Sequence, residues 1–401
     1  MPELAGFRDH FNHTIPGFSQ RALDVYRTMR EHCPITRSDQ LGGFWVVSNY
    51  DATVEILSQP DVFVSAEAAV IPALPFPCRG IPNASDPPLH HDYRGVLMPF
   101  LTPDAVARHE PMVRETVGAL IDSFIGDGEA DFVAQFASRL PCQVTAGIFG
   151  FERHDAERCY GWLSEMLNPP DGDPITAAAA ADSLHEFFVG MLAASRAEPD
   201  GNLISAISSH VRAGAGQFSD EECIALVFSA VGAALETTVS ALTSIVVYLD
   251  QLPSVRAQLI TNPSLVDRAV QEVLRMAPPA HCRARTVRRN VEVGGVTFKA
   301  ADRVLLLFGS ANYDGRRFAT PESFRLDRSD NPHLSFGHGI HSCLGAGLAQ
   351  LEMRVTLEEI LKRMPDIQVI SGSGPVIKNG AMWDYETLGV QFIARPVVQT
   401  S

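Results

Sequence analysis

The sequence is poor in positive charge. It holds 32 Lys and Arg against 47 Asp and Glu, which leaves a formal net charge of -15 at pH 7. Binding to nucleic acid or to an anionic membrane surface requires a basic face, so we expect neither as a partner. Hydrophobic residues make up 46% of the chain, which is enough for a globular protein to bury a substantial core.

Closely spaced cysteine pairs are also lacking. The seven cysteines are odd in number and show no CxxC or CxxxC spacing; they stand at positions 33, 78, 142, 159, 223, 282 and 343. This spacing argues against a zinc knuckle, and a chain of 401 residues does not depend on disulfide bonds for a core. We therefore expect a reducing, cytoplasmic location in which most thiols are buried.

The first twenty residues lack a basic stretch followed by an apolar run, so we expect neither a signal peptide nor a membrane anchor. Residues 224–249 are apolar and have the length of a bilayer span, but Glu236, Thr237 and Thr238 lie at their centre. We expect this stretch to form a long helix through the middle of a soluble protein. A carboxylate buried there is costly unless it has a task or a partner.

Helical periodicity dominates, and the strand-like stretches are short. There is no βαβ alternation, internal repeat or low-complexity linker, which favours one mainly helical domain over residues 1–401 with a small β component. The predicted helices cover residues 19–32, 51–58, 89–97, 103–125, 130–149, 153–167, 175–196, 201–212, 219–249, 253–260, 263–276 and 345–363. The predicted strands are 44–48, 291–298, 303–309, 366–370 and 388–394.

The stretch FGHGIHSCLGAG, residues 336–347, places one cysteine among four glycines. The glycines predict a loop and the following residues a helix, so Cys343 would lie at a helix N-terminus, where a thiolate is stabilised. Gly337 and Gly345 allow positive φ and close approach of a flat group. A buried, inert thiol is the ordinary alternative. A cysteine-protease nucleophile would need a base, and His341 is too close in sequence to serve.

The pattern Phe336-Gly337-x-Gly339-x-His341-x-Cys343-x-Gly345 resembles the haem-ligand loop of the cytochrome P-450 monooxygenases at every fixed position. The likeness extends over most of the chain. It implies the cytochrome P-450 fold, mainly α with small β-sheets and a long central helix across the haem. It also implies haem b (iron protoporphyrin IX) with Cys343 as its axial metal ligand, beside Phe336 as a shield from water.

Two stretches match the family's ExxR pair, beginning at Glu272 and at Glu322. Any helix can hold an ion pair at i, i+3, so the motif alone is weak evidence. The first match ends a predicted helix just before Ala-Pro-Pro, where the family's pair belongs, and the second lies in a proline-bounded loop. The resemblance implies that Glu272 and Arg275 support the haem site structurally, together with Arg328.

Four groups resemble the family's partners of the haem propionates. His90 and Arg94 share one face of a predicted helix at i, i+4, so both can meet carboxylates together, although such a pair is more often a solvated face. Arg285, ten residues after Arg275, matches a third partner, and His341 would be the fourth.

The stretch Ala233-Ala234-Leu235-Glu236-Thr237-Thr238 resembles the family's oxygen-activation segment, with alanine at 234 where glycine is common. In the family, the acid and the threonine organise water and deliver protons during dioxygen activation. This implies catalytic roles for Glu236 and Thr237. The alternatives are a structural buried ion pair for the acid and a hydroxyl bonded back to the helix for the threonine.

The resemblance also assigns pocket walls to the apolar loop 63–85 and to the central helix. The individual pocket candidates are Val231, Ala234, Leu235, Ala280, His281 and Arg283. Because the loop is apolar and proline-rich, it suits a compact hydrophobic ligand. Arg283 and His281 are candidates to receive a carboxylate or phenolate, and for Arg283 the alternatives are a propionate or solvent.

The implied function is a soluble monooxygenase that uses dioxygen to hydroxylate or dealkylate a small, mostly apolar terpenoid, aromatic or secondary-metabolite scaffold. With no fused reductase in the chain, we expect electrons from a ferredoxin and its ferredoxin reductase. One alternative is a haem-thiolate enzyme of atypical outcome: a peroxygenase, a phenol-coupling enzyme or a nitrating enzyme. The other is a non-catalytic haem protein that binds a small gas.

Overall fold

The computed structural model describes residues 8–67, 69–72, 80–167, 169, 173–212, 216–372, 376–378 and 381–395. The chain divides into two compact units, each assembled from three segments. Unit 1 comprises Met1–Leu74, Ser240–Cys343 and Pro365–Leu388, and unit 2 comprises Pro75–Val239, Leu344–Met364 and Gly389–Ser401. The fold class is the predicted one, mainly helical with small sheets.

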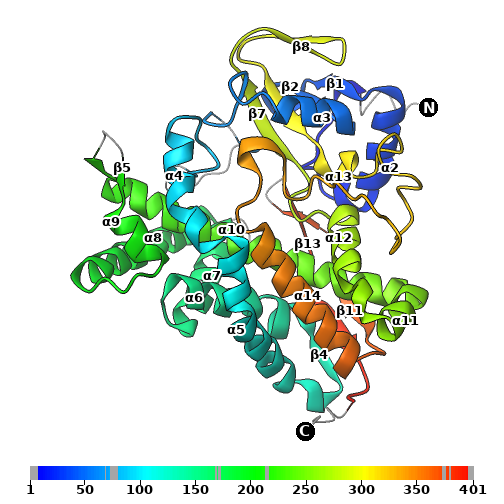
Figure 1. The fold of residues 1–401 in the computed structure, drawn as a ribbon. Coiled ribbons are helices and arrows are strands. Elements are labelled where there is room, and N and C mark those ends of the chain that lie inside the picture. Colours follow the sequence, from blue (N-terminus) through cyan, green and yellow to red (C-terminus); the bar gives the residue numbers. More distant parts are fainter. Residues whose placement is uncertain are drawn as a thin grey trace. The chain divides into compact units, whose positions relative to one another are not determined.

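Unit 1 contains a five-stranded sheet in the order β1-β2-β10-β7-β3, of which β1, β2 and β7 are labelled in Figure 1. Its strands are β1 (Ile35–Ser38), β2 (Phe44–Val47), β10 (Arg303–Leu306), β7 (Arg283–Val287) and β3 (Phe63–Val64). Neighbouring strands are antiparallel except for β2 and β10. Leu305 packs in one apolar cluster with helix α2 (Phe18–His32), whereas Val304 and Leu306 pack in another with α3 (Tyr50–Leu57). This alternation means that both faces of the sheet are covered.

Helices and three small β elements complete unit 1. The helices are α11 (Pro253–Thr261), α12 (Val266–Met276) and α13 (Phe308–Ala311). The β elements are the pairs β8 (Val291–Val293)–β9 (Val296–Phe298) and β12 (Val376–Lys378)–β13 (Met382–Asp384), and strand β11 (Gln368–Gly372).

Unit 2 is built mainly of helices. They are α4 (Leu89–Leu97), α5 (Pro103–Asp122), α6 (Arg139–Phe149), α7 (Arg153–Leu167), α8 (Pro174–Ala197), α9 (Leu203–Ser209) and α14 (Ala346–Arg363). Helices α5 and α14 lie side by side (Figure 1), and Arg354 of α14 contacts Glu110 of α5 with 2.7 Å between Nη2 and Oε2. Short strands β4 (Glu129–Asp131) and β14 (Leu388–Gln391) pair, as do β5 (Val211–Arg212) and β6 (Gly216–Gln217).

Helix α10 (Asp220–Gln251) begins in unit 2 and ends in unit 1. Within the described part of the chain it is the one helix long and apolar enough to cross a membrane, and 61% of its most apolar window is buried. Length and composition are weak evidence for a membrane span, because the core helix of a soluble protein has the same properties. The burial favours the expected core helix.

Several predicted elements differ from the observed ones. The helix predicted over 130–149 is in fact β4, a π-helical turn over Val133–Ala137 and then α6. The strand predicted over 291–298 is a hairpin, because Gly294 and Gly295 adopt φ of 58° and 76° and reverse the chain. The strand predicted over 303–309 ends at Leu306, and the helix predicted over 201–212 ends at Ser209. Strand β7 was not predicted at all.

Candidate active site

The Cys343 loop is closed by its own backbone. The Cys343 N–H donates a hydrogen bond to the Phe336 carbonyl over 2.8 Å, and Gly339–His341 form a single 3-10 turn between them. Gly339 has φ of 73°, and a Cβ there would stand 2.6 Å from the Leu57 carbonyl oxygen, so a side chain at 339 would force the loop to move. The loop thereby holds the Cys343 side chain exposed.

The two outer glycines of this loop differ in conformation. Gly337 has φ of 72°, as the loop prediction requires. Gly345 has φ of -81°, which any residue can adopt, so the expectation of positive φ is wrong there. Gly345 is instead the N-cap of α14, and Cys343 lies two residues before it, just outside the helix. The thiol therefore lies near the N-terminal end of α14, although not within its first turn.

Strand β7 carries two of the predicted cations, Arg283 and Arg285. Ala284 between them belongs to the α2 cluster, and Val287 belongs to the α3 cluster, so the two arginines lie on the same face of the strand as Val287. Arg285 is buried and donates from Nη1 to the Ala284 carbonyl over 2.7 Å. Arg283 is half-buried and donates from Nη1 to the Cys282 carbonyl over 2.8 Å. His341 of the Cys343 loop is also half-buried.

His281 and Ala280 are placed differently from Arg283. The His281 ring is buried, with Nδ1 2.8 Å from the Tyr26 hydroxyl and its ring stacked on that tyrosine. Ala280 is buried and bridges to Met382 of β13. Of the pocket candidates on this segment, Arg283 is therefore the one with an accessible side chain, and we give His281 a packing role.

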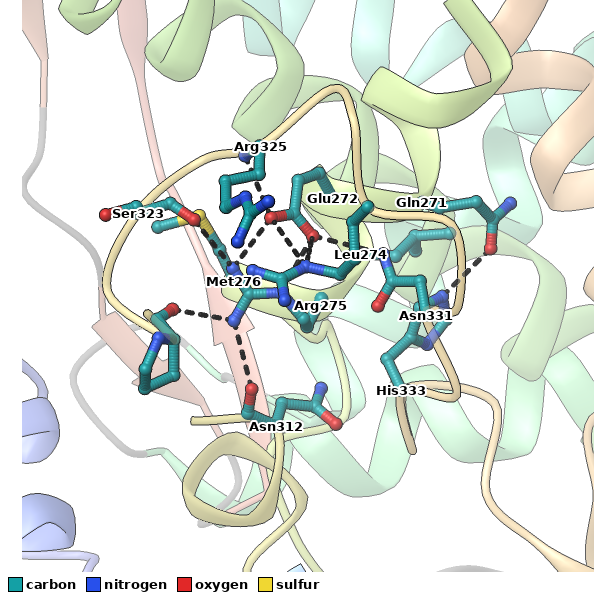
Figure 2. A network of polar contacts seen from close by, with 12 residues as sticks. Gln271, Glu272, Leu274, Arg275, Met276, Asn312, Ser323, Arg325, Asn331 and His333 are labelled. Carbon is teal, nitrogen blue, oxygen red and sulfur yellow. Dashed lines mark hydrogen bonds and ion pairs between the residues drawn. The ribbon is translucent and has the colours of Figure 1, made fainter. Parts of the chain in front are cut away.

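Glu272 and Arg275 form a buried ion pair at the end of α12, shown in Figure 2. Arg275 Nε and Nη2 donate to the two carboxylate oxygens over 2.8 and 2.9 Å. The remaining N–H groups of Arg275 reach the carbonyls of Asn312, Pro321 and Ser323, so all five donors have acceptors. Burial alone would raise the pKa of Glu272, but the Arg275 bond and charge and nearby donors hold it below its ordinary value.

Three later residues complete this network. Arg328 Nε lies 3.2 Å from Glu272 Oε1, as the resemblance implies. The backbone N–H of Arg325 donates to the same oxygen, and Asn331 donates to Oε2 over 3.1 Å (Figure 2). Sequence reasoning missed Asn331, and only its place three residues after Arg328 points to it. The second ExxR match does not pair: Glu322 lies 3.9 Å from Arg27, and Arg325 binds Asp327.

In unit 2, the predicted helix at 89–97 is α4 with the same bounds. His90 on this helix is buried, and Arg94 one turn later is half-buried. Both side chains therefore lie on one face of α4, as the i, i+4 spacing predicts.

The middle of α10 has an accessible face made of small side chains. Ala230, Ala233, Ala234 and Thr237, spaced i, i+3, i+4, i+7, are all half-buried or exposed, as are Ser229, Gly232 and Glu236 in the same stretch. Thr237 Oγ1 donates to the Ala233 carbonyl over 2.8 Å, the back-bonded state considered from the sequence.

Two other candidates on α10, Val231 and Leu235, do not share this face. The side chains of Val231 and Leu235 are buried in the core, with 2% and 0% exposure. The carboxylate expected at the buried centre of the helix, Glu236, is only half-buried. Its desolvation cost is correspondingly smaller than the sequence suggested.

The donor set determines what kind of metal group suits the Cys343 loop. Within the described residues, no cluster of three or more His, Cys, Asp and Glu side chains forms a metal site. One exposed thiol cannot complete the coordination of an iron ion, so a metal here must bring most of its own ligands. A haem does so through its macrocycle, and the buried cation Arg285 of β7 suits one of its carboxylates. The residues present therefore fit a haem ligated by Cys343.

Comparisons with known proteins give the family. The cytochrome P450 family model matches residues 176–365. The chain is 30% identical to the putative cytochrome P450 YjiB of Bacillus subtilis, over 86% of this chain and 88% of that protein. It is 32% identical to the mycinamicin IV hydroxylase/epoxidase of Micromonospora griseorubida, over 71% and 72% of the two chains. Among solved structures, the bacillaene polyketide synthase cytochrome P450 PksS of Bacillus subtilis superposes with a TM-score of 0.87 at 27% identity, covering 95% of this chain and 99% of that one. This chain belongs to the cytochrome P450 family, whose members bind haem b, and is a monooxygenase of the bacterial type.

Proposed function

We propose that this monooxygenase inserts one oxygen atom of dioxygen into a small, mostly apolar secondary-metabolite scaffold, by hydroxylation or oxidative dealkylation. The observation that carries the proposal is the exposed Cys343 thiol in its closed glycine loop. Two relatives support the substrate class, since one is a mycinamicin hydroxylase and the other belongs to a polyketide synthase pathway by name. Electrons come from an external redox partner, which we propose to be a ferredoxin with its reductase.

The chain's own residues would hold the cofactor as follows. Haem b, when bound, supplies reductive activation of dioxygen. Cys343 would donate its thiolate to the iron, and Phe336 would shield that sulfur from water. Gly337 and Gly345 would leave room beside the macrocycle. The propionates would be bound by His90, Arg94, Arg285 and His341.

The accessible face of α10 supports a role in positioning substrate and protons. Ala234 and Ala233 present only methyl groups there, which leaves space for an apolar ligand. Thr237 can release its bond to the Ala233 carbonyl and donate to a water instead, and the half-buried Glu236 can supply the next proton. Both side chains would serve proton delivery rather than substrate recognition.

We also propose that the whole chain is one catalytic domain and that the protein is soluble and cytoplasmic. The family model spans residues of both units, and the solved relative is covered almost end to end. The largely buried α10 and the net charge of -15 support a soluble protein.

The carbon monoxide difference spectrum of the reduced, haem-loaded protein tests this function. We expect the red-shifted Soret band of a thiolate-ligated haem, and its loss in Cys343→Ser, because a serine hydroxyl does not provide the thiolate. Cys33→Ala, which removes a half-buried thiol elsewhere in unit 1, should keep the band. Well-folded wild-type protein without that band would overturn the assignment.

Replacing Thr237 by Ala removes the hydroxyl that can pass a proton. We expect haem binding and substrate affinity to stay within about twofold, while product formed per electron consumed falls and peroxide rises, because a positioned proton-transfer group usually accelerates its step by about 10²- to 10⁴-fold. Thr238→Ala, a change at a buried neighbour on another face of α10, is the control. Unchanged coupling in Thr237→Ala would refute the proton role.

A further inference from the structure

Arg283 is a cation that has no carboxylate partner among the described residues. Its one hydrogen bond among the described residues goes to the carbonyl of Cys282, so most of its five N–H donors are unused. Desolvation lowers the pKa of Arg283, and the groups that oppose this effect are the sulfurs of Cys282 and Cys343. The described residues place no carboxylate near enough to contribute.

Two other half-buried arginines of unit 1 have the nearby carboxylates that Arg283 lacks among the described residues. Desolvation also lowers the pKa of Arg30, but there the carboxylates of Asp314 and Glu322 act in the opposite direction. Arg328, beside the fully buried Glu272, has its carboxylate at 3.2 Å. A desolvated guanidinium without such a partner is costly, so an unpaired one at an accessible position is a receptor for an anionic ligand.

Arg283 and Cys343 both belong to unit 1. The sulfur of Cys343 is one of the groups that raise the pKa of Arg283. Arg285 lies on the same face of β7, about 7 Å farther along the strand, because alternate residues of a strand are spaced by that length. The two arginines can therefore serve two separate anions.

The number of groups available to the haem propionates indicates where the anion comes from. This step rests on the proposed function, in which the two propionates are bound by four groups: His90, Arg94, Arg285 and His341. Arg283 is a fifth group, and most of its N–H donors are unused within the described chain. The thiolate of Cys343 does not supply the missing charge once it binds iron, because the metal neutralises it.

We propose that Arg283 binds a carboxylate carried by the substrate, so that this P450 oxidises an apolar scaffold bearing a single acid group. The acid anchors the substrate at one end, and the carbon to be oxidised lies in the apolar part. Arg283 is thereby a specificity-determining residue, and compounds that lack the acid should bind weakly.

Substrate-induced spin-state titration of the full-length, haem-loaded protein tests this. The probes are dodecanoic acid and geranic acid, each paired with its methyl ester. We expect the wild type to bind the acids at least about tenfold more tightly than the esters, as a charge-assisted bond warrants. Arg283→Gln should abolish that preference and leave ester affinity within twofold. Arg283→Lys should keep a reduced preference, and Arg288→Gln, at an exposed arginine just after β7, should behave as wild type.

Two results would overturn the proposal. One is the absence of any acid-selective shift in the wild type. The other is an unchanged acid-to-ester ratio in Arg283→Gln, together with faster haem transfer to apomyoglobin, which would assign Arg283 to a propionate. The carbon monoxide spectrum of the same samples separates this failure from failure of the proposed function, since a normal thiolate band leaves that function intact.

Discussion

Glu272→Gln is expected to lower the free energy of unfolding by about 3–5 kcal/mol, the usual result of leaving a buried charge without its partner. The carboxylate is fully buried and accepts bonds from Arg275, Arg328 and Asn331. An amide of the same shape cannot balance two guanidinium charges, and its NH₂ group would oppose their donors. Urea unfolding of the full-length protein, followed by far-ultraviolet circular dichroism, measures the loss.

Glu322→Gln is the matched control, because Glu322 begins the other ExxR stretch and is the same residue type. Its side chain is 53% exposed and its contact with Arg27 is 3.9 Å long, so we expect a change below about 0.5 kcal/mol. Equal losses of unfolding free energy in the two variants would show that the buried network around Glu272 does not stabilise the protein more than an exposed ion pair.

The ion pair of Glu272 and Arg275 also predicts that the stability of the folded protein falls in acid. The pKa of Glu272 is held below its ordinary value of 4.5 in the folded chain, so the unfolded chain takes up its proton first as pH falls. The contribution of Glu272 is complete above pH 4.5 and is lost as pH falls from there through the folded pKa. Glu272→Gln should therefore remove part of the fall in stability in that acid range.

Glu352→Gln is expected to act in the opposite direction and to stabilise the protein as pH rises. Glu352 lies on α14 with 3% exposure, and its Oε2 has no hydrogen-bond partner within the described chain. Burial raises the pKa of Glu352 to about 8. At pH 7 the folded protein therefore keeps this carboxyl protonated, whereas the unfolded chain ionises it near 4.5.

The difference between the folded and unfolded pKa of Glu352 determines how stability changes with pH. Between pH 4.5 and 8 the unfolded state loses a proton that the folded state retains, so the wild type loses about 1.4 kcal/mol of stability per pH unit to this group. Glu352→Gln cannot ionise. The unfolding free energy of the variant minus that of the wild type should therefore increase at that rate up to pH 8 and then level off. Burying an amide in place of the carboxyl adds a constant to this difference and does not change its slope.

Unfolding free energies measured at pH 5, 6, 7 and 8 give this slope directly. Glu359→Gln, on the same helix but only partly buried, should run parallel to wild type. A Glu352→Gln curve that is also parallel to wild type would mean that the buried carboxyl ionises at its ordinary pKa.

Much of the site could be predicted because its parts are local in sequence. The closed loop before Cys343 depends on glycines within ten residues of one another, and the bounds of α4 follow from its own periodicity. The choice of Glu272 over Glu322 depended on which stretch ends a helix before a proline. In each case the controlling interactions lie within a few turns of chain.

Strand β7 could not be predicted in this way. Its five residues show no clear alternation of apolar and polar side chains, and β7 forms because β10 and the distant β3 pair with it on its two sides. That pairing places Arg283 and Arg285 on one face. It also separates Arg283 from His281, whose ring bonds a tyrosine 255 positions earlier in the chain.

By itself, the sequence determined the helical fold class, the glycine loop before Cys343 and the ion pair at the end of α12, because short-range spacing governs each of them. The tertiary structure alone decided the charge environment of individual side chains. Glu236, expected to be buried, is half-buried, whereas Glu352, which no motif marks, lies in the core, and Arg283 has no carboxylate among the described residues near it. Burial and pairing are set by residues distant in sequence, and desolvation depends on all of them together.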